Sequence, residues 1–552
     1  MNKLENTLKH QLNDEQAVPY PDFGDMWSRL EQAGDTSPVR MSTADLRGGQ
    51  RGRNWRRITI AASLSALLAA APVYAAIQYD WGNLLRYRDG VQAALDQNLG
   101  QALEQSITRD GVTLTLHTAL VDDNRTVILY SMDVGKGADT EIWGVKGMSL
   151  KDEQGNSSGG EYSYQQWDEE KQLYNGYFES DWTPGKDEAE VTLTASAVRA
   201  LSQAEQELPL NSSSTERQNF PLGIEGMKSV EVKSFEQNED KLLLSSAVDY
   251  DNPEAKEWTF PMIVAYKGDT RVEPIPGGAL GTPGENGEYT MKQYFKPSEI
   301  SGGDAIFKLQ YTKVEQTIAG PWSFDLKLSK KLMESGTIKT ALNAPLEAGD
   351  TMHTFEQMVV TPTQIRVTLR AKEKYEQLPY YKYNLEVGGT TLEGNLFRSP
   401  NDDPFLTTLR FERPSGLVID EQTDITFVGK YKVTTHEDDK TPLLLKNISA
   451  EKQTVIRDTG GYEVKWTYYM QGNDLYVETE SDDPHFGGVN QTHIGLGNER
   501  ILGKPETINF AGDGNNKAID IYKDYKGTEA SIYTFYYMTD EPDKETRVLL
   551  RP

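Results

Sequence analysis

The stretch VTLTLHTALVDDNRTVILYSMD, residues 112–133, shows the pattern on which most of the chain is built. Apolar and polar residues alternate in its first run, Asp122-Asp123-Asn124 interrupts them, and a second apolar run, Thr126–Tyr130, follows. Alternation with a period of two is typical of a strand with one buried face, and Asp and Asn favour turns. The stretch therefore predicts two strands joined by a polar turn.

Three later stretches repeat this order of strand, polar turn and strand. They begin at Val230, His353 and Tyr462, so the four starts are 118, 123 and 109 residues apart. A later strand can close each unit, and these strands are expected near 189–195, 305–311, 423–429 and 546–550. This period fits a β-sandwich of about 100 residues plus a linker. We predict a mainly β fold of tandem immunoglobulin-like β-sandwich modules over residues 107–205, 220–332, 340–446 and 450–552, with three modules as the alternative count.

An uncharged run of twenty residues, ITIAASLSALLAAAPVYAAI, lies before these units at Ile58–Ile77. At about 1.5 Å per residue, a helix of that length matches a hydrocarbon core of roughly 30 Å. Basic residues precede the run and aromatic residues lie at both edges, as they do at membrane interfaces: Arg53, Trp55, Arg56, Arg57, Tyr79 and Trp81. We predict a single transmembrane helix, with residues 1–57 in the cytoplasm and 78–552 outside the cell, and a stalk helix over 78–106.

Two other interpretations of this run stay open. Its eight alanines make it only moderately apolar, so it could be a buried helix. Val73-Tyr74-Ala75 resembles a small-residue cleavage site, although signal peptides usually total about 15–30 residues and this one would be far longer. If the run does span a membrane, Ala61, Ser65 and Ala69 place small residues at a spacing of four, which could favour a homodimer through the helix.

The tail of residues 1–57 contains two short helical patterns followed by a linker rich in Gly, Ser, Thr and Arg. Apolar residues recur on one helical face in each pattern: Leu4 and Leu8 in the first, and Phe23, Met26, Trp27 and Leu30 in the second. A tail of this size buries little surface by itself, and aromatic and Met anchors at this spacing are typical of a helix that binds in a groove. We predict that these residues bind a cytoplasmic partner. A hairpin of the two helices and a helix lying on the membrane are the alternatives.

The 552-residue chain has a net charge of −27, and residues after 77 carry 48 basic and 76 acidic side chains. Such a polyanion repels nucleic acid, so we expect no nucleic-acid partner. The chain has no cysteine, which excludes disulfides and thiolate metal sites. The six histidines show no metal-binding spacing, and Gly155–Gly159 matches G-x-S-x-G only within a polar loop. We therefore expect no cofactor, no metal and no enzyme activity.

Residues from about 50 to 135 contain NWRRITIAASLSALL, WGNLLRYRDGVQAAL and a run from Gln101 to DDNRTVILY. In these stretches the chain resembles a domain-of-unknown-function family of Gram-positive single-pass membrane proteins. Members of that family are similar to membrane-anchored anti-sigma factors and have immunoglobulin-like external domains. The tail, MNKLENTLKHQLNDEQAVPYPDFGDMWSRLEQ, also resembles the cytoplasmic tail of the family. Because the His and paired-Cys pattern of zinc-type anti-sigma factors is absent, the resemblance implies an anti-sigma factor of another kind.

These features together predict an anti-sigma-like regulator anchored in membrane lipid by one helix. Its tail would bind a cytoplasmic sigma factor or a similar regulator, and its external modules would sense the cell envelope through an unknown ligand. The alternative is a cell-surface structural or adhesive β-sandwich protein that binds cell-wall polymer. A sigma factor encoded next door would favour the regulator, whereas cell-wall binding by residues 107–552 alone would favour the alternative.

Overall fold

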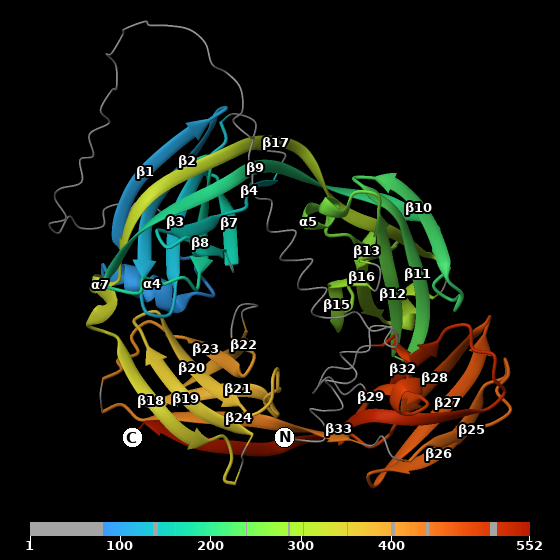
Figure 1. The fold of residues 1–552 in the computed structure, drawn as a ribbon. Coiled ribbons are helices and arrows are strands. Elements are labelled where there is room, and N and C mark those ends of the chain that lie inside the picture. The colour runs from blue at the N-terminus through green and yellow to red at the C-terminus, as the bar shows by residue number, and fades with distance from the viewer. Residues whose placement is uncertain are drawn as a thin grey trace, which may run out of the picture. The chain divides into compact units, whose positions relative to one another are not determined.

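The computed structural model describes residues 81–551, with gaps at 136–141, 161, 239, 285–286, 302, 350–351, 399–402, 421, 438–440 and 508–515 (Figure 1). The described residues are mainly β and form five sheets, in which the strands pair in antiparallel fashion. This confirms the predicted class at the level of a mainly β protein with several antiparallel sheets. The helical elements of this part are short: α4 (Asp89–Asp96), η2 (Pro253–Ala255), α5 (Lys256–Thr259), α6 (Pro297–Ile300), α7 (Lys331–Glu334) and η3 (Gly497–Glu499).

Three of the sheets have five strands each and share one strand order: first, second, third, fifth, fourth along the chain. The β1 sheet contains β1 (Gln101–Arg109), β2 (Val112–Val121), β3 (Thr126–Asp133), β8 (Leu173–Ser180) and β7 (Tyr162–Asp168). The β10 sheet contains β10 (Gln218–Ile224), β11 (Met227–Asn238), β12 (Lys241–Tyr250), β16 (Tyr289–Phe295) and β15 (Ile275–Pro283). The β26 sheet contains β26 (Gln453–Thr459), β27 (Tyr462–Gln471), β28 (Asp474–Glu480), β32 (Ala518–Tyr522) and β31 (Lys504–Pro505).

The same strand order recurs at the start of the 11-stranded β18 sheet. Its first five positions are β18 (Ile338–Pro345), β19 (His353–Val360), β20 (Gln364–Ala371), β23 (Leu406–Glu412) and β22 (Thr390–Phe397). It continues through β21 (Tyr380–Val387), β24 (Ile425–Glu437), β33 (Ala530–Arg551), β29 (Phe486–Ile494) and β30 (Ile501–Leu502), with β25 (Leu443–Leu445) paired to β33. The repeated strand order shows that the chain uses one β arrangement four times.

The four repeats seen in the sequence are confirmed as antiparallel strand pairs. The stretches that begin at Val112, Val230, His353 and Tyr462 form β2–β3, β11–β12, β19–β20 and β27–β28. In each pair, apolar side chains of alternating positions lie in a buried core, as Leu114 and Leu116 do in β2. The period-two pattern therefore identified the second and third strands of every repeat.

Two long strands link neighbouring cores in the first half of the described chain. β9 (Glu188–Leu208) pairs with β17 (Ala305–Ser329) from Glu188–Ser329 to Leu208–Phe307, and Figure 1 shows the two strands running side by side. The rest of this seven-stranded sheet is β14 (Thr270–Val272), β13 (Met262–Lys267), β4 (Ile142–Lys146), β5 (Ser149–Asp152) and β6 (Ser157–Gly159). Trp322 and Phe324 of β17 pack against the β1 sheet, whereas its Phe307 and Leu309 belong to the core of the β10 sheet.

In the second half, the long strand β33, which pairs with β24, likewise contributes to two cores. This changes one expected assignment. Ile532 of β33 lies in the core of the β26 sheet, but Leu550 of the same strand lies in the core that contains Phe355 and Phe427. The strand expected at 546–550 to close the last unit therefore closes the third. Likewise residues 318–328 complete the first core, outside the expected module of 107–205. Local alternation identifies a strand, but it does not show which core the strand completes. One long strand can contribute side chains to two cores.

The stalk helix expected over residues 78–106 differs from the structure. Only Asp89–Asp96 is α-helical in the described part of that range, and β1 begins at Gln101. Asn98 adopts a positive φ of 57° after the helix, and every second residue of QALEQSI then turns inward along β1. The apolar stripe that suggested one long helix is thus divided between a two-turn helix and an edge strand.

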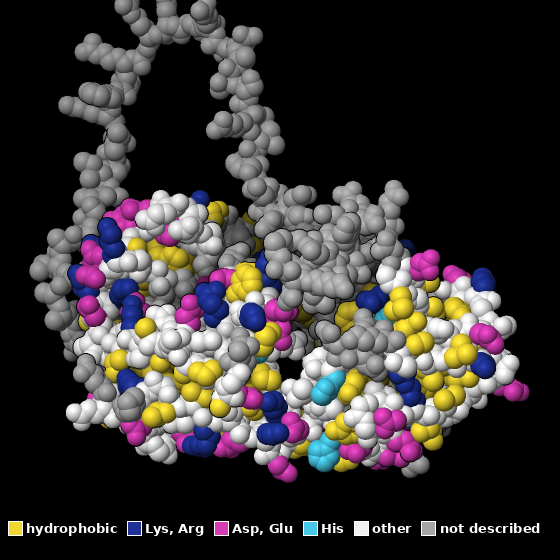
Figure 2. Space-filling model, turned by 60° about the horizontal axis from the view of Figure 1, so that its bottom comes forward, with side chains coloured by type: hydrophobic (Ala, Val, Ile, Leu, Met, Phe, Trp, Pro, Cys, Tyr) yellow, Lys and Arg dark blue, Asp and Glu magenta, His cyan; other side chains and the backbone are white. Residues whose placement is uncertain are grey.

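No helix of the described residues is long and apolar enough to span a membrane. The predicted segment Ile58–Ile77 and the tail of residues 1–57 lie outside the described residues. Acidic and basic side chains are interspersed over the surface shown in Figure 2, where they alternate with small apolar areas. Two large aromatic side chains, Trp322 and Trp466, are fully buried in cores.

Candidate functional site

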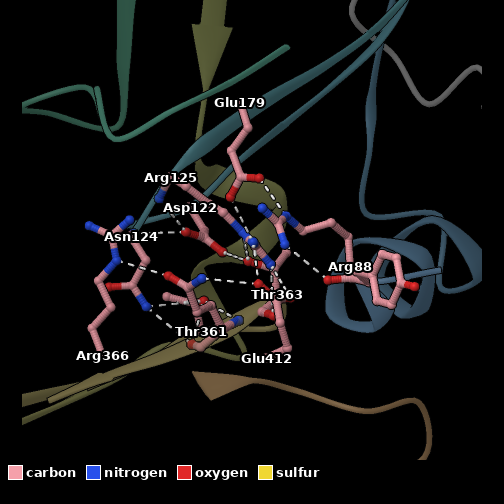
Figure 3. Close-up of polar contacts among 11 residues, drawn as sticks. Arg88, Asp122, Asn124, Arg125, Glu179, Thr361, Thr363, Arg366 and Glu412 are labelled. Carbon is pink, nitrogen blue, oxygen red and sulfur yellow. Dashed lines mark hydrogen bonds and ion pairs between the residues drawn. The ribbon is translucent and has the colours of Figure 1, made fainter. Parts of the chain in front are cut away.

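The turn between β2 and β3 places a cluster of polar side chains inside the protein. Asp122 shapes this turn, because its Oδ1 accepts hydrogen bonds from the backbone N–H groups of Asn124 at 2.7 Å and Arg125 at 3.0 Å. An Asp that caps its own turn in this way fixes the backbone two and three residues ahead. The side chains of Asn124 and Arg125 then extend toward residues 359–364 and 412 (Figure 3).

Arg125 is the centre of the cluster, and its side chain is only 1% exposed. Its guanidinium donates to Glu179 at 2.8 Å, to both carboxylate oxygens of Glu412 at 2.7 and 2.8 Å, and to the hydroxyl and carbonyl oxygens of Thr363 at 3.0 Å each. A guanidinium has five N–H donors, so all of them are used. Burial alone would lower the pKa of Arg125, but Glu412 and Glu179 outweigh it and raise that pKa above its ordinary value. Arg125 therefore remains a fully satisfied buried cation.

Glu179 of β8 binds two arginines. Its Oε2 accepts from Arg88 Nε at 2.6 Å, and its Oε1 accepts from Arg125. Burial tends to raise the pKa of this carboxyl, but Arg125 and Arg88 lower it below its usual value. Glu179 is thus an anion that holds the segment just before α4 against the start of β3.

A second set of contacts joins the turn to the residues between β19 and β20. Thr363 Oγ1 donates to Asp122 Oδ2 at 2.6 Å, and Asn124 Nδ2 donates to the carbonyl oxygens of Gln364 at 3.1 Å and Val359 at 3.2 Å. Gln364 in turn donates to Glu412 at 3.1 Å. The partners in this set are more than 230 residues apart from the turn, so these bonds depend on the tertiary fold.

Helix α4 also packs closely against this cluster, at Thr363. A Cβ atom at Gly90 would lie 1.8 Å from the carbonyl oxygen of Thr363, so only glycine fits there. Val91, Ala94 and Leu95 of the helix are buried in a core with Leu129 of β3. We call the set Arg88, Asp122, Asn124, Arg125, Glu179, Thr363, Gln364 and Glu412 the Arg125 joint, since it ties residues 88–179 to residues 363–412.

The groups of the Arg125 joint bind one another within the chain. Its two arginines and three carboxylates all form hydrogen bonds inside the joint, and its Thr363 hydroxyl donates to Asp122 and accepts from Arg125. Among the described residues, no group of three or more His, Cys, Asp and Glu side chains could hold a metal ion. A buried ion pair of this kind adds little net stability when intact, yet removal of one partner costs roughly 3–5 kcal/mol, because the other charge stays buried. Each member of the joint therefore depends on the presence of its partners.

A cavity of about 310 Å³ opens next to the Arg125 joint. Its walls come from the turn before α4, from β8 and from the face of β20, β22 and β23, through Arg86, Tyr87, Arg88, Asp89, Glu179, Gln364, Asn395, Arg410 and Glu412. Arg410 is only 7% exposed and its guanidinium lies 3.1 Å from the ring centre of Phe397. The cavity thus shares Arg88, Glu179, Gln364 and Glu412 with the joint.

The site residues predicted from the sequence lie almost entirely in the undescribed part. Those outside the described residues are Leu4, Leu8, Phe23, Met26, Trp27, Leu30, Arg53, Trp55, Arg56, Arg57 and Tyr79. Trp81 is described, and its side chain is 2% exposed in a core with Leu85, Leu120 and Val127. A ring buried in protein does not lie among lipid headgroups, so the expected interfacial position of Trp81 is corrected to a core position.

Sequence reasoning missed the Arg125 joint, because it treated Asp122-Asp123-Asn124 as a turn and nothing more. One signal was present: an arginine directly precedes the run TVILY, Thr126–Tyr130, at a strand start that is expected to be buried. A charged residue at such a position needs a partner. The partners themselves, Glu179 and Glu412, lie 54 and 287 residues away, and no local pattern connects them to Arg125.

Residues 50–133 match a family described as a domain of unknown function (DUF4179). The matched segment ends with the last residue of β3, and so includes α4 and the turn that carries Arg125. It covers the stretches in which the sequence resembled a domain-of-unknown-function family, and that resemblance is confirmed at this level. No curated protein matches the chain.

One solved structure matches the chain, and its title reads "The crystal structure of the conserved domain protein from Bacillus anthracis". The match is 11% identical, covers 42% of this chain and 92% of the other, and has a TM-score of 0.16. A likeness at that score supports no statement about fold or function. The class that can be stated is a mainly β protein of several antiparallel sheets, similar over residues 50–133 to a family of unknown function.

Proposed function

We propose that this chain is a membrane-anchored, anti-sigma-like regulator with immunoglobulin-like β-sandwich modules that sense the cell envelope. In this proposal Ile58–Ile77 spans the membrane and the tail of residues 1–57 binds a cytoplasmic sigma factor or a similar regulator. The family match over residues 50–133 supports it, because the matched segment runs from the basic flank of the predicted span into β3.

The observation that carries the proposal is the Arg125 joint. The segment that follows the predicted span, residues 81–133, is held by it to Thr363 and Glu412, more than 230 residues further along the chain. A load or ligand acting on the β sheets would then reach the start of this segment through few intermediate groups. In this proposal the joint is the two-state element that a transmembrane signal needs: its contacts are formed in this structure and are broken when the signal is transmitted.

The test targets the predicted binding stripe of the tail in the full-length protein. Trp27→Asp with Leu30→Asp should abolish co-purification of a sigma factor, identified by mass spectrometry from membranes, and should release transcription that depends on that factor. The matched control carries Ser28→Asp with Gln32→Asp, which adds the same charge to the opposite face of the same predicted helix. A topology reporter fused after residue 81 and after residue 552 tests the orientation.

Two results would reject the proposal. One is a tail that retrieves no sigma factor in either form; the other is a reporter that places residue 552 in the cytoplasm. Binding of cell-wall polymer by a protein whose tail variants behave as wild type would instead support the adhesive alternative.

A further inference from the structure

The β10 sheet and the β26 sheet contact each other, although their strands come from different halves of the described chain. Their facing side chains form one small apolar core, which joins Phe235, Leu243 and Tyr294 of the β10 sheet to Tyr476, Ile519 and Ile521 of the β26 sheet. Long strands already link the first core to the second and the third core to the fourth. This contact is therefore a second connection between the two pairs of cores, besides the Arg125 joint.

Hydrogen bonds between side chains cross the same contact. Gln471 Nε2 donates to the carbonyl oxygen of Thr215 at 2.9 Å. Lys233 Nζ donates to the hydroxyl oxygen of Tyr476 and, at 3.4 Å, to Gln471 Oε1. We call the small apolar core together with Lys233, Gln471 and Thr215 the Lys233 contact.

The ammonium of Lys233 is buried in this contact without a counter-ion. The residue is 5% exposed, and its Nζ lies 4.0 Å from the ring centre of Tyr476 and 4.8 Å from that of Phe235. Among the described residues, no carboxylate forms an ion pair with Lys233. Two aromatic rings replace part of the lost hydration of a cation, but a buried charge without an opposite charge beside it remains costly.

More distant charges do not change this balance. Glu506, Asp474 and Glu231 favour the charged form of Lys233, whereas Arg217, which pairs with Glu231 at 3.3 Å, opposes it. Burial outweighs them and lowers the pKa of Lys233 to about 8. The fold therefore holds this lysine where its neutral form is the better fit.

The other titratable groups near the contact either act in the same direction or keep one state. Lys292 of β16 faces Glu506, Lys504 and Asp520 of the fourth repeat, and burial lowers its pKa too. Burial raises the pKa of Tyr476 to about 12, so its hydroxyl keeps its proton below that pH. A second lysine thus adds to the effect of Lys233.

We propose that the Lys233 contact opens and closes reversibly, and that a proton on Lys233 favours the open form. In the closed form the ammonium is buried without a counter-ion, whereas in the open form water surrounds it. A neutral lysine has no such penalty, so loss of the proton favours closure. The Arg125 joint differs in this respect, because Glu179 and Glu412 bind its guanidinium directly. The two connections between the pairs of cores therefore respond differently to pH.

A rise in pH should close the contact. The pKa of Lys233 is about 8 in the closed form, and the ordinary value of 10.5 applies in water, so the closed form binds fewer protons between these values. The ratio of closed to open form is therefore lowest below pH 8 and rises with pH through this window. Between pH 7.5 and pH 10 the rise should be about 50-fold.

The test is dipolar electron paramagnetic resonance on full-length protein in detergent micelles. The chain has no cysteine, so Ser213→Cys with Asn473→Cys places one spin label on each side of the contact, at two exposed residues. At pH 7.5 the wild-type background should show a short and a long distance, and at pH 10 the short one should predominate. Lys233→Met should show the short distance at both values. The matched control is Lys228→Met on the same strand, whose ammonium is 59% exposed in an ion pair with Asp249 and whose loss should change nothing.

Several outcomes would overturn the proposal. A single distance at both pH values in the wild-type background would show that the contact does not open and close. Equal distance distributions in that background and in Lys233→Met at pH 7.5, or a pH response that Lys233→Met retains in full, would assign no role to Lys233. The wild-type pH series gives this answer even if Lys233→Met fails to fold, which near-UV circular dichroism will check. None of these measurements involves the tail or the predicted span, so this proposal and the proposed function can fail separately.

Discussion

At the scale of single residues, replacement of Arg125 should lower the unfolding free energy more than replacement of any other residue of the joint. Arg125→Met keeps most of the volume but leaves the buried carboxylate of Glu179 with Arg88 alone and removes both bonds of Arg125 to Glu412. We expect a loss of roughly 3–5 kcal/mol of unfolding free energy. Urea unfolding at pH 7 measures this.

The control for Arg125 is the exposed pair of Arg217 with Glu231, for which Arg217→Met should cost less than about 1 kcal/mol. The double variant Arg125→Met with Glu412→Gln should recover part of the loss, because it no longer leaves the Glu412 carboxylate without its cation. A double variant as unstable as the sum of the two single variants would contradict the assignment of these residues to one network.

His117 of β2 should make the protein less stable in acid. Its side chain is 4% exposed, its Nε2 lies 2.8 Å from Ser131 Oγ, and burial lowers its pKa to about 4. Between about pH 6.5 and 4 the unfolded chain takes up a proton that the folded one does not, so stability falls as the pH falls through this window. The lowering from 6.5 to about 4 corresponds to a contribution of about 3 kcal/mol. His117→Gln should lack this part of the pH dependence, as thermal unfolding midpoints at pH 4.5 and 7.5 will show.

Asp520 of β32 should have the opposite effect. Burial raises its pKa to about 7; Thr492, which donates to its Oδ2 twice at 2.6 Å, and the nearby charge of Lys292 only partly offset this. The folded chain therefore holds a proton that the unfolded one has lost, and stability falls as the pH rises from about 4 to 7. Asp520→Asn should be more stable than wild type above pH 7 and should lose this slope. A variant whose midpoint follows the wild type at every pH would contradict the assignment.

At the scale of elements, the contact of α4 with the joint depends on one missing side chain. Gly90→Ala would place a Cβ atom 1.8 Å from the Thr363 carbonyl oxygen, which is backbone and cannot rotate away. We expect α4 to shift off this contact and the protein to lose about 1–3 kcal/mol, as is usual for overpacking. Gly185→Ala is the control, because nothing lies within 4 Å of the Cβ position there. Equal stability of the two variants would show that α4 does not need this contact.

The elements also show how far the sequence alone could lead. Alternation predicted the strand pairs β2–β3, β11–β12, β19–β20 and β27–β28, because each has one buried face and a polar turn of its own. It did not predict that β17 and β33 each complete two cores, since periodicity describes a strand but not its partner. It also merged α4 and β1 into one helix, because their leucines fall on a shared stripe.

The candidate site was harder still to predict. The role of a turn residue such as Arg125 depends on Glu179 and Glu412, which the fold brings to it from elsewhere in the chain. The cavity depends on the same assembly, since its arginines come from a turn and from β23. From the sequence alone, one could infer only that a charged residue at the start of a buried strand needs a partner.

At the scale of the whole molecule, the engaged and broken states of the Arg125 joint should correspond to different outputs of the tail. Glu412→Gln is the variant to use, because this side chain is 27% exposed and its change weakens the joint while Arg125 keeps Glu179 as a counter-ion. If the proposed function holds, full-length protein with Glu412→Gln should raise sigma-dependent transcription in cells by about fivefold, the lower end of typical coupling between sites. Glu231→Gln removes the same charge from an exposed ion pair and should leave transcription unchanged. Membrane fractions probed with an antibody must contain equal amounts of both variants, so that abundance does not explain the difference.

If Trp27→Asp with Leu30→Asp raises transcription and Glu412→Gln does not, the tail acts as a regulator but the joint is not part of its signal path. If neither variant raises it, the regulator proposal itself fails, because the joint was invoked only to carry a signal to that tail.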